Sequence, residues 1–191
     1  MDKDTLKGLF LDSLARLPTP FRQRVEIVLA GYWRISRTEE LIQRVLDGEL
    51  CDEDDRDYWT MGLEDERGHA DAYRLDLRDW YGQQMAERLI SAYQPCPGMY
   101  WLLTEGIGDC PYTLGIYRTY LELGLISMPP EALKEAREWL PRTMAIHEAA
   151  DPGHADAGLD YLLRYHWENP AVEIEMVEKM LIAEINHRGV R

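Results

Sequence analysis

The expected fold and site of this chain depend most on the stretch His147-Glu148-Ala149-Ala150-Asp151-Pro152-Gly153-His154. It reads H-x3-D-x2-H, and residues at i, i+4 and i+7 lie along one face of a helix. At about 1.5 Å of rise per residue, the two histidines would be about 10 Å apart along the axis. That separation is long for two ligands of one ion. It suits two neighbouring ions that each take one histidine, with the aspartate between them.

Two other interpretations of this stretch stay open. An exposed acidic helix face would also carry such residues, since acidic side chains are common in this chain. The Asp151-Pro152-Gly153 segment is poor helix chemistry, because Gly costs about 1 kcal/mol and Pro about 3 kcal/mol in a helix interior. A break there is what a site that opens its backbone would tolerate, and a plain loop would explain it too.

Composition restricts the class of protein. The chain has 191 residues, with 21 basic and 35 acidic side chains and a net charge of −14. The length predicts one domain with a substantial core. The negative charge argues against nucleic acid and against anionic membrane surfaces as partners, because both need basic patches. No apolar run approaches the 18 or so residues of a membrane-spanning helix.

The cellular compartment is expected to be the cytoplasm. Met1-Asp2-Lys3-Asp4 lacks the basic and then apolar layout of a signal peptide. Cys51, Cys96 and Cys110 are scattered, with no C-x-x-C motif. We interpret them as reduced thiols in a cytoplasmic protein and not as a disulfide framework.

Apolar residues recur at helical spacing nearly everywhere, and no segment alternates cleanly with period two. The pattern predicts an all-α fold, a single-domain bundle of about seven helices over residues 1–191. The expected helical segments are 6–17, 21–35, 38–48, 52–81, a short one to 93, an interrupted stretch 99–126, 130–167 and 170–187. In this interpretation Thr38 caps the third segment, and Pro129 and Pro130 open the seventh.

A second candidate motif precedes the first in the chain. Glu66-Arg67-Gly68-His69 reads E-x-x-H, and Glu and His at i and i+3 reach one ion from one helix. The alternative is a solvent-facing Glu beside a partly buried His. Ferritin-like di-iron bundles need two such motifs. This chain has one, so that architecture is disfavoured.

A third candidate ligand is Glu105, which stands in the otherwise apolar segment 101–108. A carboxylate among Trp and Leu is costly unless it is paired or bound to a cation. Asp109 lies one turn further along and is an alternative. Glu122, between Leu121 and Leu123, is a second alternative that we rank lower.

Together these motifs resemble the haem-oxygenase-like di-iron oxidases. This family is also called the iron-containing redox enzymes and is related to the TenA and PqqC folds. Residues 147–163 resemble the family's last metal helix, with Ala and a Leu-rich run after the triad. Residues 105–125, where the Glu is followed by Pro111 and Tyr112, resemble the middle helix, and residues 46–82 resemble the first. The resemblance covers roughly residues 38 to 165.

The resemblance implies a haem-oxygenase-like fold that holds two Fe(II) ions, with O2 as co-substrate. The implied metal ligands are Glu66, His69, Glu105, His147, Asp151 and His154. One iron would take Glu66, His69 and His154, the other His147 and Asp151, and Glu105 would bridge them. Glu64 or Asp65 would supply a further carboxylate, where the family has one. The expected partner is a small-molecule substrate of amino-acid, amine or fatty-acid type, and a homodimer is left open.

Two other functions stay open from the sequence. The first is a metal-free TenA- or PqqC-like small-molecule enzyme or binding protein, which would use Glu105 or a cysteine. The second is a helical module that binds a protein partner through a tyrosine-rich face. Iron content separates the di-iron oxidase from both.

Overall fold

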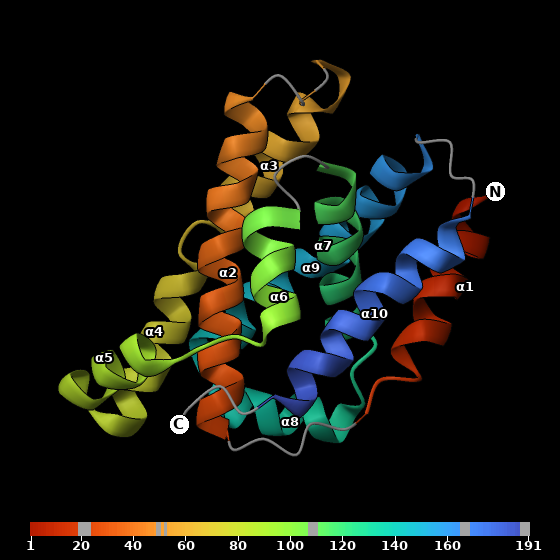
Figure 1. Ribbon diagram of the computed structural model, residues 1–191. Helices are drawn as coiled ribbons and strands as arrows, with labels where there is room; N and C mark the ends of the chain where they lie inside the picture. The colour runs from red at the N-terminus through yellow and green to blue at the C-terminus, as the bar shows by residue number, and fades with distance from the viewer. Residues whose placement is uncertain (19–23, 49–50, 52, 107–110, 165–168, 188–191) are drawn as a thin grey trace.

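The protein is helical throughout the part of the chain that the computed structural model describes (Figure 1). That part is the whole chain except residues 19–23, 49–50, 52, 107–110, 165–168 and 188–191, and residues 105–106 and 150–152 are described by their backbone alone. The α-helices are α1 (Lys3–Leu14), α2 (Arg24–Asp47), α3 (Arg56–Glu66), α4 (His69–Tyr81), α5 (Gln83–Ala92), α6 (Pro97–Trp101), α7 (Pro111–Ile126), α8 (Pro130–Trp139), α9 (Pro141–Leu163) and α10 (Pro170–Asn186). A 3-10 turn (Glu53–Asp55) precedes α3, and a π-helical turn (Leu102–Gly106) follows α6.

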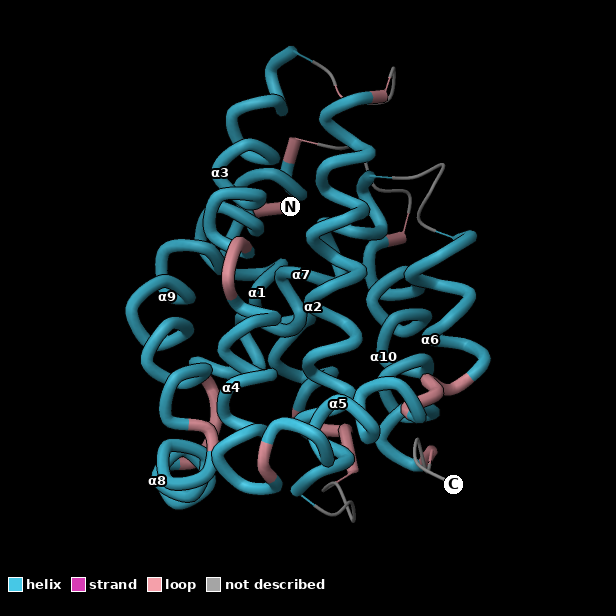
Figure 2. Tube along the Cα trace, turned by 90° about the vertical axis from the view of Figure 1, so that its left-hand side faces the viewer, coloured by secondary structure: helices cyan, strands magenta, loops and turns pink. Residues whose placement is uncertain are grey.

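The helices surround α2 and α7. Figure 2 shows α9 on one side of the molecule and α6 on the other, with α2 and α7 between them. The most extensive packing is between α7 and α9, followed by α2 against α4 and α3. In Figure 1, α10 crosses this group obliquely, and α4 and α5 lie at one lower edge. The prediction of an all-α fold is confirmed for the described residues, which form ten α-helices where about seven were expected.

One predicted boundary is absent. The sequence suggested two helices, 21–35 and 38–48, with Thr38 as the cap of the second. The structure has a single helix, α2, and Thr38 lies buried inside it, where its Oγ1 donates to the carbonyl of Arg34 at 2.9 Å. A threonine can bond to its own helix four residues back as well as cap a new one. The apolar face that continues through Ile35 and Leu41 favours the continuous helix.

Two boundaries were missed. The segment 52–81 was expected to be one helix, but α3 ends at Glu66 and α4 begins at His69, with Gly68 between them at φ +88°. Glycine adopts this left-handed conformation without the steric cost that other residues meet. The segment 130–167 likewise divides at Leu140, and Pro141 opens α9, because proline suits a first helical turn and disrupts an interior one.

The Pro152-Gly153 dipeptide does not end α9. The helix assignment runs from Pro141 to Leu163 without interruption, so His147, Asp151 and His154 lie on one helix, as their spacing predicted. A break or loop at this point is therefore not observed.

The interior consists of two apolar clusters. The larger joins α1, α2, α3, α6, α7, α9 and α10, and the smaller joins α2, α4, α5 and α8 with the start of α9. Large aromatic side chains fill the first cluster, with Tyr58 stacked on Tyr161 at 4.4 Å between ring centroids and Trp59 edge-on to Tyr161. This agrees with the abundance of Tyr and Trp and the scarcity of Phe in the chain.

A buried carboxylate on α4 caps the N-terminus of α9. Asp76 accepts from the backbone N–H of Arg142 at 3.3 Å and of Thr143 at 3.0 Å, and from the Thr143 hydroxyl at 2.9 Å. These are the second and third residues of α9, whose N–H groups have no partner inside the helix. The residue before α9 is Leu140, which has no side-chain acceptor. Asp76 therefore acts as the missing cap and fixes α4 against α9.

We expect Asp76→Ala to lower the free energy of unfolding by about 1–3 kcal/mol, because a cap is lost and buried donors are left unpaired. Asp79→Ala is the matched control. Asp79 bonds to the same Arg142 at 2.6 Å, but its side chain is 61% exposed, so its loss should cost less than about 1 kcal/mol. Urea denaturation measures both values. Equal losses in the two variants would contradict the capping role.

Candidate functional site

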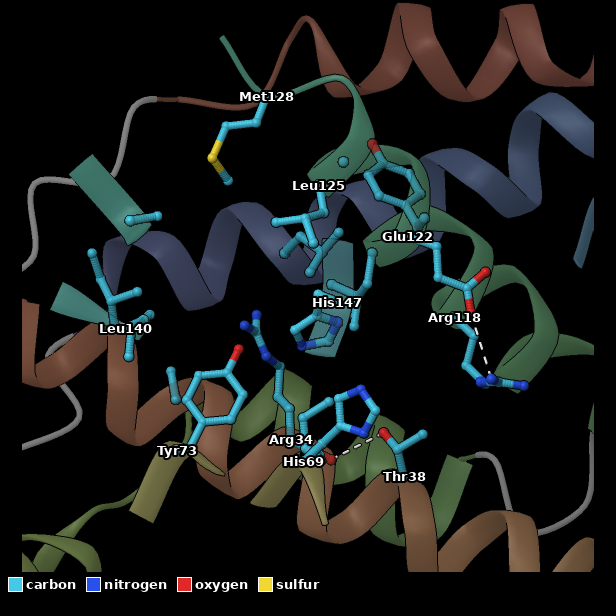
Figure 3. Close-up of a pocket in the computed structure, with 18 of the residues that line it drawn as sticks. Arg34, Thr38, His69, Tyr73, Arg118, Glu122, Leu125, Met128, Leu140 and His147 are labelled. Atoms are coloured by element: carbon cyan, nitrogen blue, oxygen red, sulfur yellow. Dashed lines mark hydrogen bonds and ion pairs between the residues drawn. The ribbon is translucent and has the colours of Figure 1, made fainter. Parts of the chain in front are cut away.

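A cavity of about 350 Å³ lies between the two apolar clusters. Its volume falls in the range of small-molecule sites, roughly 300–1,000 Å³. Most of its wall is apolar, from residues such as Leu125, Met128, Leu140 and Met144 (Figure 3). The remaining wall is formed by charged and aromatic polar side chains. The cavity is therefore an apolar chamber with a polar region.

Four of the six expected metal ligands line this cavity. They are Glu66, His69, His147 and His154. Glu66 ends α3, His69 begins α4, and the two histidines of α9 are separated by two turns. Asp151 lies between them on α9, and Glu105 lies in the π-helical turn, but the side chains of both are outside the described residues.

The imidazoles form two groups. The rings of His69 and His147 lie 4.7 Å apart between centroids, inclined by 61° (Figure 3). His154 instead places its Nε2 2.6 Å from Oδ2 of Asp65. The resemblance grouped His69 with His154 and placed His147 on the other ion. The geometry brings His69 beside His147 and gives His154 a carboxylate of its own.

The E-x-x-H motif spans the break between α3 and α4. Glu66 and His69 do not share a helix, because Gly68 turns the chain between them. Both still line the cavity, with His69 buried and the Glu66 side chain 13% exposed. The alternative of a solvent-facing Glu is therefore wrong.

Two further carboxylates reach the cavity. Asp65 does so from α3, while Glu64, the other residue considered for that role, is exposed. Glu122 does so from α7 and is buried, although the sequence analysis ranked it below Glu105. The argument that singled out Glu105, a carboxylate among apolar neighbours, applies equally to Glu122 between Leu121 and Leu123.

Arg118 lies between two of these carboxylates, and the sequence analysis did not identify it. It is buried, with Nε 3.4 Å from Oε1 of Glu66 and Nη2 3.5 Å from Oε1 of Glu122. Burial opposes its charge, but Tyr58, Glu122 and Glu66 raise the pKa of Arg118 above its ordinary value. Its spacing of four residues from Glu122 on α7 was a usable signal for an ion pair.

The charges around the cavity do not cancel. The described carboxylates in its wall are Asp65, Glu66, Glu122 and Glu184, and the described guanidinium groups are Arg34 and Arg118. With ionised carboxylates and neutral histidines, four negative and two positive charges leave a net charge of −2. Enclosed charges of one sign repel one another and are poorly solvated. The cavity therefore favours a cation.

The donor chemistry fits iron. Imidazole nitrogen and carboxylate oxygen are suitable ligands for iron in a mixed site. Oε2 of Glu66 is buried and has no hydrogen-bond partner among the described residues. Within the same part of the chain, no three His, Cys, Asp or Glu side chains converge as a ready-made metal site. The described donors therefore line one cavity in separate pairs, such as His69 with His147 and His154 with Asp65.

Other expectations concern the thiols and membranes. Cys51 and Cys96, the two cysteines that the structure describes, are reduced thiols, and Sγ of Cys96 accepts from the Met99 N–H at the start of α6. None of the described helices combines the length and the apolar composition that crossing a bilayer requires.

Comparison with known proteins gives no match to a family model, to a curated protein or to a solved structure. A fold alone does not determine a function. The inference of function therefore depends on the cavity and the side chains that line it.

The position of His69 depends on Gly68. Because Gly68 has φ +88°, we expect Gly68→Ala to destabilise the protein by about 1–2 kcal/mol. Gly8→Ala is the control, since Gly8 lies inside α1 with open space around its Cα. That variant should gain about 0.5–1 kcal/mol from the helix propensity of Ala. Chemical denaturation tests both, and a stabilising Gly68→Ala would contradict the left-handed turn.

Proposed function

We propose that this protein is a non-haem di-iron oxidase or oxygenase that uses O2 to oxidise a small organic molecule. One observation carries the proposal: four of the six expected ligand side chains, from three helices, line one largely apolar cavity. Buried imidazoles and carboxylates cost free energy unless they are paired or bind a cation. Their meeting at a cavity whose described wall has four carboxylates and two guanidinium groups supports a metal site.

The residues proposed to hold the metal extend the expected set by two. They are Glu66, His69, His147, Asp151 and His154, with Glu105 or Glu122 as the carboxylate from the middle of the chain and Asp65 as an addition. Bound ferrous ions would supply the electrons that reduce O2. The protein would contribute nitrogen and oxygen ligands from helices that are packed against one another.

The apolar wall would serve the reaction in two ways. Leu125, Met128, Leu140 and Met144 would give an organic substrate a surface to pack against, and the bound substrate would displace water from that surface. Exclusion of water also protects reactive species from side reactions. An open, hydrated acidic cleft would offer neither advantage.

Arg118 favours a second candidate, a metal-free small-molecule enzyme or binding protein. Its guanidinium lies between Glu66 and Glu122, so part of the negative charge in the cavity is already neutralised by the protein. In the di-iron proposal Arg118 instead orients the two carboxylates. The amount of iron bound distinguishes these two roles.

Anaerobic loading with ferrous iron should give close to two ions per chain. His147→Ala and His154→Ala should each lower the iron content by about one ion, because each removes a nitrogen ligand from a different group of donors. Iron is measured by elemental analysis after gel filtration, together with the absorbance change on exposure to O2.

His187→Ala is the matched control for these histidine variants. His187 caps the end of α10 and bonds through Nε2 to the carbonyl of Gln94 at 3.0 Å, away from the cavity wall. Its removal should leave the iron content unchanged. Full iron retention in both cavity variants would exclude the di-iron assignment and favour the metal-free candidate.

The carboxylate from the middle of the chain can be identified by comparing Glu122→Gln with Glu105→Gln. Because Glu122 lines the cavity beside Arg118, we expect Glu122→Gln to lower the iron content, while the similar shape of Gln preserves the fold. Circular dichroism and iron analysis measure both properties. A loss of iron in Glu105→Gln alone would assign the ligand to the π-helical turn.

A further inference from the structure

A second ion pair lines the cavity wall and includes none of the predicted metal ligands. Arg34 of α2 places Nη1 3.1 Å from Oε2 of Glu184 of α10. Their side chains are 22% and 2% exposed, and both line the cavity. The pair joins two helices that are distant in sequence, and none of the expected metal ligands belongs to either helix.

The hydrogen bonding of this pair is incomplete. A guanidinium has five N–H donors, and a carboxylate has about four acceptor positions. Among the described residues, Nε of Arg34 and Oε1 of Glu184 have no hydrogen-bond partner. A buried ion pair offsets its desolvation only when further hydrogen bonds satisfy its remaining donors and acceptors. The pair therefore keeps one unsatisfied donor and one unsatisfied acceptor in the wall of a cavity that has room for a ligand.

The pair lies close to the candidate metal ligands. The buried hydroxyl of Tyr117 interacts electrostatically with Arg34, Glu184 and Glu66, so all three lie around one phenol. Burial raises the pKa of Tyr117, which keeps the phenol neutral. In Figure 3 the Arg34 guanidinium projects into the same space as the rings of His69 and His147.

The charges of the pair select the head group of a ligand. Arg34 and Glu184 cancel, so a zwitterion leaves this part of the wall neutral and gives each partner an opposite charge to bind. A carboxylic acid without an amine would add negative charge to a cavity whose described wall already has four carboxylates and only two guanidinium groups. An amine without a carboxylate would leave the donors of Arg34 unsatisfied.

We propose that Arg34 and Glu184 bind the zwitterionic head of an α-amino acid that has a large apolar side chain. Arg34 donates to the carboxylate, and Glu184 accepts from the ammonium. The apolar side chain packs along Leu125, Met128 and Leu140. Only the view that this ligand is the substrate rests on the proposed function.

Two ligand series test the head group on the metal-free protein by titration calorimetry. The first is L-phenylalanine, 3-phenylpropanoate and 2-phenylethylamine. The second is 2-aminooctanoic acid, octanoate and heptylamine. In at least one series the amino acid should bind roughly tenfold or more tightly than either truncated ligand, the factor expected from one lost charge-assisted hydrogen bond. No preference for the amino acid in either series would overturn the inference.

The double variant Arg34→Met/Glu184→Gln removes both charges together, so no buried charge is left unpaired. We expect it to lose the preference for the amino acid. The control is Lys179→Met/Glu175→Gln, on α10 with Glu184. It removes an exposed ion pair, 2.8 Å between Nζ and Oε1, and should keep the preference for the amino acid. If the first double variant is unfolded by circular dichroism, Arg34→Lys, which keeps the charge but loses the planar fork, should weaken the preference. An unchanged preference in the folded Arg34 variant would overturn the inference.

Ferrous iron content, measured on the same preparations, separates this inference from the proposed function. Preferred binding of the amino acid by a protein that holds no iron would support the inference and exclude the oxidase. Two ions per chain without any preference for the amino acid would support the oxidase and overturn the inference.

Discussion

The bond between Asp76 and the N-terminus of α9 is the constraint on which the site depends. Asp76 lies two helical turns after His69 on α4, and Thr143 lies one turn before His147 on α9. A single buried carboxylate therefore fixes the register of the two helices close to the point where the two imidazoles meet, 4.7 Å apart. Packing alone permits small sliding of helices, whereas a cap with several hydrogen bonds defines one position.

The polar side chains beside the cavity pack closely against neighbouring helices, and two glycines leave room for them. A Cβ on Gly62 would collide with the guanidinium of Arg118, and a Cβ on Gly158 would collide with the hydroxyl of Thr119 and approach Oε2 of Glu122 at 3.5 Å. Both glycines lie inside helices, where glycine is less stable than alanine by roughly 0.5–1 kcal/mol. This cost in helix stability is offset because the missing Cβ atoms leave room for the buried ion pair of Arg118 and Glu122. The glycines of α3 and α9 therefore admit the polar side chains of α7 at some expense in helix stability.

Local pattern predicted some features of this protein and not others. The helical spacing of residues 147–154 placed three candidate ligands on one helix, since periodicity depends only on neighbouring residues. The break at Gly68 was missed, because a glycine inside an apolar pattern reads as a tolerated defect until its φ is known. Arg118 was missed for a different reason. An isolated arginine in a sequence is expected to be exposed, and only the packing of α9 against α7 and α3 reveals that Arg118 is enclosed.

Two of the described arginines line the cavity, and each comes from a different helix. Arg118 on α7 pairs with Glu66 and Glu122, and Arg34 on α2 pairs with Glu184 of α10. Each guanidinium is paired, so neither imposes a bare positive charge on a ligand. Because the two pairs share no helix, a substitution in one pair removes no partner from the other.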